Sequence, residues 1–148
     1  MKNKYKKFNK DVLQELLQQY LGTYECELLE SLDDYLFDIG LPNSAFPAEQ
    51  YAALGELVKY QMQLSSVMCS VEAQLKRKER DKLVANAEIL EELIDDGYVK
   101  NERERSQLLY KSPSIVDAKQ ELDELETVRD YIKSKHFMLV HIMKLYGK

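Results

Sequence analysis

The last third of the chain carries a regular pattern of hydrophobic positions. From Ile115 onward, apolar residues recur at alternating spacings of three and four, so they share one face of a helix. Ser112 before Pro113, or Ser114 with Asp117 three residues later, supplies a helix start. The pattern predicts a long helix that packs on a partner helix. Its stripe contains Ile115, Ala118, Leu122, Leu125, Ile132, Leu139, Met143 and Tyr146, with Arg129 and His136 in the same series.

Two shorter helical patterns lie on either side of Gly22. The first begins at Asn9 or Asp11, and the second ends at the segment 40–47, which holds two of the chain's prolines. In both, the spacing of the apolar residues predicts one buried face. These residues are Val12, Leu13, Leu16, Leu17, Tyr20 and Leu21 in the first helix, and Tyr24, Leu28, Leu29, Leu32, Tyr35, Leu36 and Ile39 in the second.

A much longer helix is predicted between Pro47 and Asp96. Pro47 suits the first helical position, and only Gly55 interrupts the helix formers that follow. A single helix of about 50 residues would be roughly 75 Å long, with a kink near Gly55 or in the charged centre as the alternative. The predicted apolar face is Leu54, Leu57, Tyr60 or Met62, Leu64, Val67, Met68, Val71 and Leu75, and again Leu83, Val84, Ala87, Leu90, Leu93 and Ile94.

The composition favours helices throughout. Hydrophobic residues make up 45% and charged residues 32%, while 148 residues include only 5 Gly and 3 Pro. No segment alternates polar and apolar residues for long enough to build a sheet. We predict an all-α fold in which long helices form an elongated antiparallel hairpin or bundle that assembles into a homo-oligomer. Residues 1–40 would supply a basic arm and an acidic helical segment, and residues 47–148 a helical core.

The hydrophobic runs are too short for a membrane protein. The longest is about five residues, whereas a membrane-spanning helix needs about 20. The Lys-rich start lacks the apolar core of a secretory signal. We therefore expect a soluble protein in the cytoplasm, which would be the host cytoplasm if a phage encodes the chain. Cys26 and Cys69 lack CxxC spacing, so reduced thiols are expected.

The formal net charge is −5, and its sign alternates in blocks along the chain. Residues 1–10 carry five Lys with Tyr5 and Phe8, which is typical of either a solvated terminus or an arm that contacts phosphate. The second short helix has a purely acidic face, which we interpret as a solvated face or a docking surface for a basic partner. That face contains Glu25, Glu27, Glu30, Asp33, Asp34 and Asp38.

Two basic segments are candidates for phosphate contact. In the segment 76–82, which reads KRKERDK, nearly two helical turns contain no apolar residue. Such a turn either forms a solvated surface with i, i+4 ion pairs or lines a nucleic-acid backbone. In the segment 98–111, cations alternate with rings, as single-strand binding by charge neutralisation and base stacking requires. The residues there are Lys100, Arg103, Arg105 and Lys111, beside Tyr98 and Tyr110.

Two short motifs resemble the tailed-phage recombination mediator UvsY family. The first is "VEAQ" at residues 71–74, which leads into the basic turn. The second is "DYIKSKHFMLVHI" at residues 130–142, where the family has an acid, an aliphatic residue, "IKSR", Phe and an "IKHI"-like ending. The order of elements agrees over about residues 60–146. Leu83-Val84-Ala85 stands where the family has an aromatic residue after the basic turn.

The resemblance implies a small helical protein that forms a ring-like homo-oligomer and binds single-stranded DNA. It would help to load a strand-exchange recombinase onto DNA covered by a single-strand-binding protein. The implied DNA contacts are Lys76, Arg77, Lys78, Arg80 and Lys82, to which we add Arg103, Arg105, Lys111, Lys133 and Lys135 as candidates. The implied oligomerisation residues are Ile132, Phe137, Leu139, Val140, Ile142 and Met143, to which we add Tyr146.

Nothing in the sequence predicts an enzyme, a cofactor or a metal site. His136 and His141 are five residues apart, so they lie on different helix faces and do not form an HExxH zinc pair. No glycine-rich phosphate loop or nucleophile signature is present. The alternative to a recombination mediator is an acidic helical adaptor or inhibitor that docks a basic protein through residues 25–38 without binding DNA.

Overall fold

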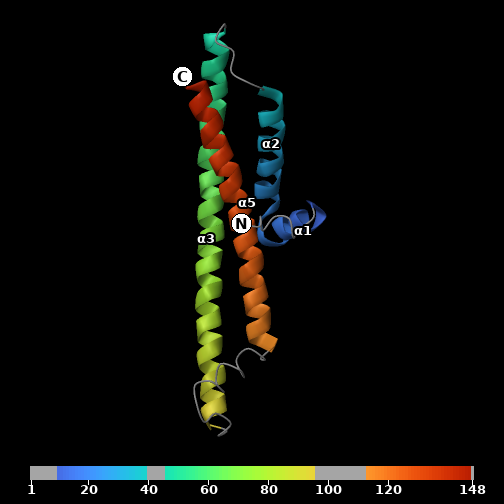
Figure 1. Cartoon of the computed structure of the whole chain (residues 1–148), viewed down its shortest axis with the longest axis vertical. Helices are drawn as coiled ribbons and strands as arrows, with labels where there is room; N and C mark the ends of the chain where they lie inside the picture. Colours follow the sequence, from blue (N-terminus) through green and yellow to red (C-terminus); the bar gives the residue numbers. More distant parts are fainter. Residues whose placement is uncertain (1–9, 40–45, 96–112, 148) are drawn as a thin grey trace, which may run out of the picture. The chain divides into compact units, whose positions relative to one another are not determined.

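A computed structural model of the chain describes residues 10–39, 46–95 and 113–147, and these residues form four helices (Figure 1). The helices are α1 (Lys10–Tyr20), α2 (Thr23–Ile39), α3 (Pro47–Asp95) and α5 (Pro113–Tyr146). No strand occurs in these three ranges, so the all-α prediction is confirmed. The predicted basic arm, apart from Lys10, and the segment 98–111 lie outside the described residues.

The helices begin where the local sequence predicts. The carbonyl of Gly22 accepts a hydrogen bond from the Cys26 amide at 3.1 Å, so the first turn of α2 begins directly after Gly22. The carbonyl of Phe46 accepts one from the Gln50 amide at 3.1 Å, so Pro47 is the first residue of α3. A proline at this position lacks only an amide that would have no helical partner. α3 then runs unbroken through Gly55 for 49 residues.

The chain divides into two compact units. Unit 1 comprises Met1–Val71 and Thr127–Lys148, and unit 2 comprises Glu72–Glu126. Unit 1 therefore holds α1, α2, the first half of α3 and the last part of α5. Its core is formed by leucines and branched aliphatic residues from all four segments, together with one tyrosine. They are Leu16, Leu17, Leu21, Leu28, Leu29, Leu32, Leu57, Leu64, Val67, Val71, Val128, Ile132, Leu139 and Tyr146.

Polar contacts show how the helices of unit 1 run relative to one another. The Tyr24 hydroxyl accepts a hydrogen bond from Gln63, and the Tyr35 hydroxyl donates one to the carbonyl of Ala53, both at 3.4 Å. Rising residue numbers on α2 thus meet falling numbers on α3, so these helices are antiparallel. Tyr146 donates to the carbonyl of Ile39 at 3.3 Å, where the C-terminal ends of α2 and α5 meet. In Figure 1, α1 lies across the start of α2.

Unit 2 has a smaller core, made of Leu75 from α3 and three residues of α5. The predicted return of an apolar face at Leu83, Val84 and Ala87 is wrong. Leu83 is 69% and Val84 52% exposed, and Ala87 is exposed as well. The reason is the spacing of the residues along the helix. Polar, half-buried side chains occupy the positions three and four residues apart that follow Leu75 on the same face of α3, so Leu83, Val84 and Ala87 lie on other faces. The polar side chains are Lys78, Lys82 and Asn86.

The periodicity prediction for α5 is confirmed over its whole length. The ten positions of its stripe are all buried or half-buried, including Arg129 and His136.

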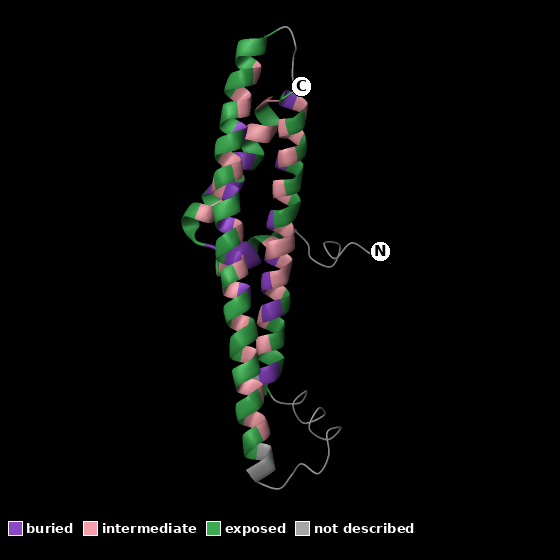
Figure 2. Ribbon diagram, turned by 90° about the vertical axis from the view of Figure 1, so that its left-hand side faces the viewer, coloured by how far each residue is buried: buried purple, intermediate pink, exposed green. Residues whose placement is uncertain are grey.

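On α3, the sequence left open whether Tyr60 or Met62 occupies a core position, and the structure places Tyr60 there. Tyr60 is half-buried with its ring 5.4 Å from that of Tyr35, whereas Met62 is 69% exposed. Exposed residues recur along one side of α3 (Figure 2).

Leu139 and Phe137 allow a direct test of this core. Leu139 is fully buried and Phe137 is 78% exposed, although both were predicted to serve in oligomerisation. We expect Leu139→Ala to lower the free energy of unfolding by about 2–5 kcal/mol and Phe137→Ala by less than about 0.5 kcal/mol. Urea unfolding followed by helical circular dichroism measures both values. Equal effects of the two substitutions would contradict the burial of Leu139.

Candidate nucleic-acid interface

The candidate interface in unit 2 is the basic turn of α3, residues 76–82. Lys76, Arg77 and Arg80 are exposed and project from the side of α3 opposite Leu75. Within the part of the chain that the structure describes, none of the three has an ion-pair partner. Their charges are therefore available to an external anion.

The other two cations of the turn are oriented differently. Lys78 Nζ lies 2.9 Å from Glu121 Oε2 of α5, and both side chains are about two-fifths exposed. Lys82 is half-buried on the same face of α3. An ion pair of this exposure contributes at most about 1 kcal/mol to stability. It nevertheless pairs Lys78 with a carboxylate of the same chain, so Lys78 is not a free cation. The structure thus brings together three of the five predicted contacts as a free basic surface.

Of the remaining predicted contacts, Lys133 and Lys135 belong to unit 1. Lys133 is exposed, but Lys135 Nζ donates a hydrogen bond to Asp33 Oδ1 at 2.7 Å and lies 5.5 Å from the centre of the Tyr131 ring. Lys135 therefore joins α5 to α2 and is not a free cation. Arg103, Arg105 and Lys111 lie outside the described residues.

The environment of Lys135 favours its charged form. Burial by itself would lower the pKa of Lys135, but the hydrogen bond to Asp33 and the neighbouring Tyr131 and Asp33 raise it above the usual value. Burial also raises the pKa of Tyr131, an effect that Lys135 partly offsets. Both shifts mean that the folded state favours protonated side chains at these two positions.

The predicted oligomerisation residues fall into two groups. Ile132 and Leu139 are fully buried and Tyr146 is 7% exposed, so the chain's own helices occupy these side chains. A second copy cannot reach them while unit 1 stays folded. Val140, Ile142 and Met143 are half-buried, and Phe137, at 78%, is the one member classed as exposed. The sequence pattern alone does not distinguish an intramolecular core stripe from an intermolecular one.

The acidic face of α2 is exposed as predicted. Glu27, Glu30, Asp34 and Asp38 are all open to solvent, and Glu25 is half-buried. Asp33 is the member that pairs with Lys135. In the three described ranges, no cluster of three or more His, Cys, Asp or Glu side chains has the arrangement of a metal site.

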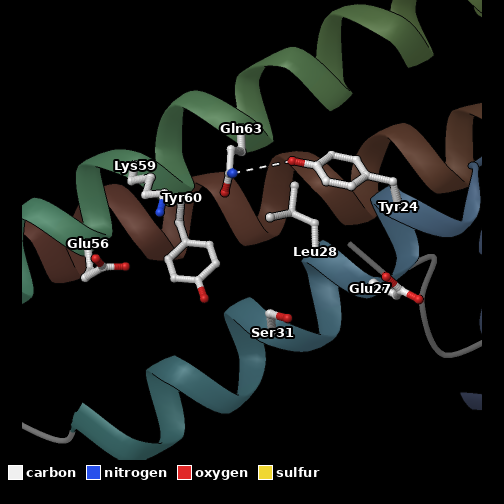
Figure 3. A pocket seen from close by; sticks show the side chains of 8 residues that line it. All are labelled: Tyr24, Glu27, Leu28, Ser31, Glu56, Lys59, Tyr60 and Gln63. Atoms are coloured by element: carbon white, nitrogen blue, oxygen red, sulfur yellow. Dashed lines mark hydrogen bonds between the residues drawn. The ribbon is translucent and has the colours of Figure 1, made fainter.

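A small groove lies between α2 and α3 in unit 1 (Figure 3). Its volume is about 270 Å³, just below the usual range of ligand pockets, which begins at about 300 Å³. Tyr24, Glu27, Leu28 and Ser31 line it from α2, and Glu56, Lys59, Tyr60 and Gln63 line it from α3. The Gln63–Tyr24 hydrogen bond crosses the groove, so these side chains join the two helices.

The cysteine and histidine side chains have structural surroundings. The Cys26 thiol donates to the carbonyl of Leu17 at 3.6 Å. Burial raises its pKa, as do the neighbouring Glu25 and Glu30, so the thiol stays protonated at neutral pH. His136 Nε2 lies 3.5 Å from the Ser65 hydroxyl, a long contact that joins α5 to α3.

No protein-family model, curated protein or solved structure matches this chain. The resemblance to the UvsY family therefore stays a prediction that rests on two short motifs. Among the described helices, none combines the length and apolar character that crossing a bilayer requires.

The Lys135–Asp33 pair predicts a specific alkaline sensitivity. Because the folded-state pKa of Lys135 is raised, the pair stabilises the fold at pH values below about 10.5 and loses its effect as the pH rises through that higher pKa. We expect Asp33→Asn to lower the free energy of unfolding by about 0.5–1 kcal/mol at pH 8, and the difference from the native chain to shrink above pH 10.5. Urea unfolding at several pH values measures this difference, and a constant difference up to pH 12 would contradict the assignment.

Proposed function

We propose that the chain binds single-stranded DNA through the basic turn of α3. The observation that carries the proposal is the exposure of Lys76, Arg77 and Arg80 on one side of the helix, without ion-pair partners among the described residues. Lysine and arginine supply most protein contacts to phosphate, and such contacts need no base sequence. The exposed Leu83 and Val84, one turn further along, offer an apolar surface to unstacked bases.

The specific role that we propose is that of a non-enzymatic recombination mediator without a cofactor. It would help to load a strand-exchange recombinase onto DNA that a single-strand-binding protein covers. The support for this role is the resemblance of residues 71–74 and 130–142 to the mediator family. The proposal includes an elongated antiparallel arrangement of α3 and α5 and assembly into a homo-oligomer. Three phosphate contacts bind weakly, and an oligomer repeats them along one strand.

The exposed acidic face of α2 favours a second function. Glu27, Glu30, Asp34 and Asp38 present four carboxylates over three helical turns, which suits an adaptor that docks a basic protein. An adaptor of this kind would bind a Lys-rich peptide and lose that binding when the four carboxylates are changed to amides. A DNA-binding mediator would keep its affinity for single strands after the same substitutions.

Replacement of the three free cations tests the proposed interface. Each contact to single-stranded DNA contributes about 0.7 to the slope of log affinity against log salt concentration. Changing Lys76, Arg77 and Arg80 together to Ala should therefore reduce that slope by about 2 and abolish binding near physiological salt. Fluorescence anisotropy with a labelled oligonucleotide measures both effects.

The matched control changes Lys59, Lys119 and Lys144 to Ala. These lysines are exposed, and their loss changes the net charge by the same amount. We expect the control to keep most of the slope and affinity. An equal loss in both variants would show that net charge alone governs binding, and no binding by the native chain at low salt would contradict the proposal.

Release of Lys78 should strengthen DNA binding. Glu121→Gln removes the carboxylate that lies 2.9 Å from Lys78 Nζ, so this cation becomes available to phosphate. We expect tighter binding to single strands and a salt slope larger by about 0.7. Asp117→Asn is the control, because it makes the same charge change on an exposed side chain of α5. Equal gains from both variants would contradict a specific role of the Lys78–Glu121 pair.

A further inference from the structure

One side of α5 in unit 1 combines exposed positive charge with exposed aromatic rings. Phe137 is 78% exposed, and Lys133, His141 and Lys144 are exposed as well. At 3.6 residues per turn these four side chains lie within about 80° of one another around the helix, roughly opposite the buried Leu139. The four residues are called the outer stripe below.

The sequence around the outer stripe is free of acidic residues. No Asp or Glu occurs in residues 131–148 or in residues 57–71, although the chain contains 26 of them. The second segment belongs to the part of α3 in unit 1, where the Ser65 hydroxyl lies 3.5 Å from His136 Nε2 of α5. A polyanion that approaches the outer stripe therefore finds no row of carboxylates on α5 or on the adjacent part of α3.

Two carboxylates at α5 in unit 1 are engaged by cations. Asp33 Oδ1 lies 2.7 Å from Lys135 Nζ, and Asp130 Oδ1 lies 3.3 Å from a guanidinium nitrogen of Arg129. The two lysines of the outer stripe differ from these cations, because neither has an ion-pair partner within the described ranges. Their charges are therefore available to an external anion.

The spacing along the outer stripe matches a short single strand. Lys133 and Lys144 are 11 positions apart, which is about 16 Å along the helix. A stacked strand advances about 3.4 Å per nucleotide, so this length corresponds to about five phosphates. Phe137 and His141 lie between the two lysines in the same stripe, so their rings are within the length of helix that such a strand would cover.

Interleaved cations and rings fit single-stranded nucleic acid better than other anionic partners. Lysines neutralise its phosphates, and rings stack on its bases, which a duplex keeps inside. A membrane surface requires a helix with a broad apolar face. Of the described α5 residues in unit 1, only Phe137 and Met138 are large, apolar and exposed. An acidic peptide would engage the two lysines but would give the rings no partner.

We propose that the outer stripe is a second contact site for single-stranded DNA, in which Phe137 stacks on a base and Lys133 and Lys144 bind phosphates. Phe137 then serves in DNA contact instead of the oligomerisation that the resemblance implies for it. The inference rests on the proposed function, because it takes the same ligand, but the site belongs to unit 1 and uses none of the cations of the basic turn. With two phosphate contacts the site is weak and is measured at low salt.

An introduced tryptophan reports on the outer stripe directly, because the chain contains no Trp. Phe137→Trp keeps an aromatic ring at the site, and a base that stacks on the indole should quench most of its fluorescence. Met138→Trp is the matched control, because Met138 is also exposed but lies about 100° away around α5. A thymidine oligonucleotide of about 10 nucleotides should quench Phe137→Trp and leave Met138→Trp nearly unchanged.

An abasic oligonucleotide of the same length separates stacking from charge. It carries the same phosphates without bases, so it should bind to the lysines but should not quench the fluorescence of Phe137→Trp. Equal quenching by the two oligonucleotides would overturn the proposal, because charge alone would then explain the signal. Equal quenching of Phe137→Trp and Met138→Trp would overturn it as well, since the effect would not belong to one side of α5.

A turn variant, in which Lys76, Arg77 and Arg80 are changed to Ala, separates the outer stripe from the basic turn. The stripe uses none of these cations, so the quenching of Phe137→Trp should persist in the turn variant at low salt. DNA binding by the native chain without quenching of Phe137→Trp would overturn the outer stripe and leave the basic turn in place. Quenching that disappears in the turn variant would show that the turn alone holds the strand, and it would also overturn the proposal. Absence of binding by both chains would contradict this site and the proposed function together.

The turn variant also allows fluorescence anisotropy to measure the affinity and salt dependence of the outer stripe alone. Phe137→Leu keeps an apolar side chain but removes the ring, so it should weaken binding about 5–150-fold without changing the salt slope. Phe137→Tyr keeps the ring and should retain the affinity. Lys133→Ala should instead lower the slope by about 0.7. Equal affinities of Phe137→Leu and Phe137→Tyr would show that no ring is stacked and would overturn the assignment of Phe137.

Discussion

Unit 1 depends on the burial of the apolar stripe of α5 against the other helices. Ile132 and Leu139 have no exposed surface, and together with Leu57 and Leu64 of α3 they form the interior that excludes water. Tyr146 and Lys135 then join the same helix to α2 through hydrogen bonds. Because these side chains stabilise the single chain, they cannot also form an interface between copies. Any self-association of the folded chain would have to use a surface that folding leaves exposed.

The described cations of this acidic protein include a paired group and an unpaired group. Lys135 and Lys78 are neutralised by carboxylates of other helices, whereas Lys76, Arg77 and Arg80 have no such partner among the described residues. The net charge of −5 does not by itself prevent nucleic-acid binding, because interactions between exposed charges are screened beyond about 8–10 Å. Nucleic-acid binding as proposed would therefore depend on the local surface, and the two ion pairs reduce the number of free cations that the described residues present.

Local sequence patterns predicted the four described helices and most of their buried faces. The spacing of three and four, Gly22 and Pro47 predicted all four described helices and the complete stripe of α5, because helical periodicity and chain breakers act over a few residues. Of the candidate site, it located the basic turn but not which cations are free. The folded structure was needed to show that Lys135 pairs with Asp33, 102 residues away, that Tyr60 rather than Met62 packs inward, and that Leu83 and Val84 face solvent. These outcomes depend on which helix lies opposite each residue, and that is settled by packing between segments distant in the chain.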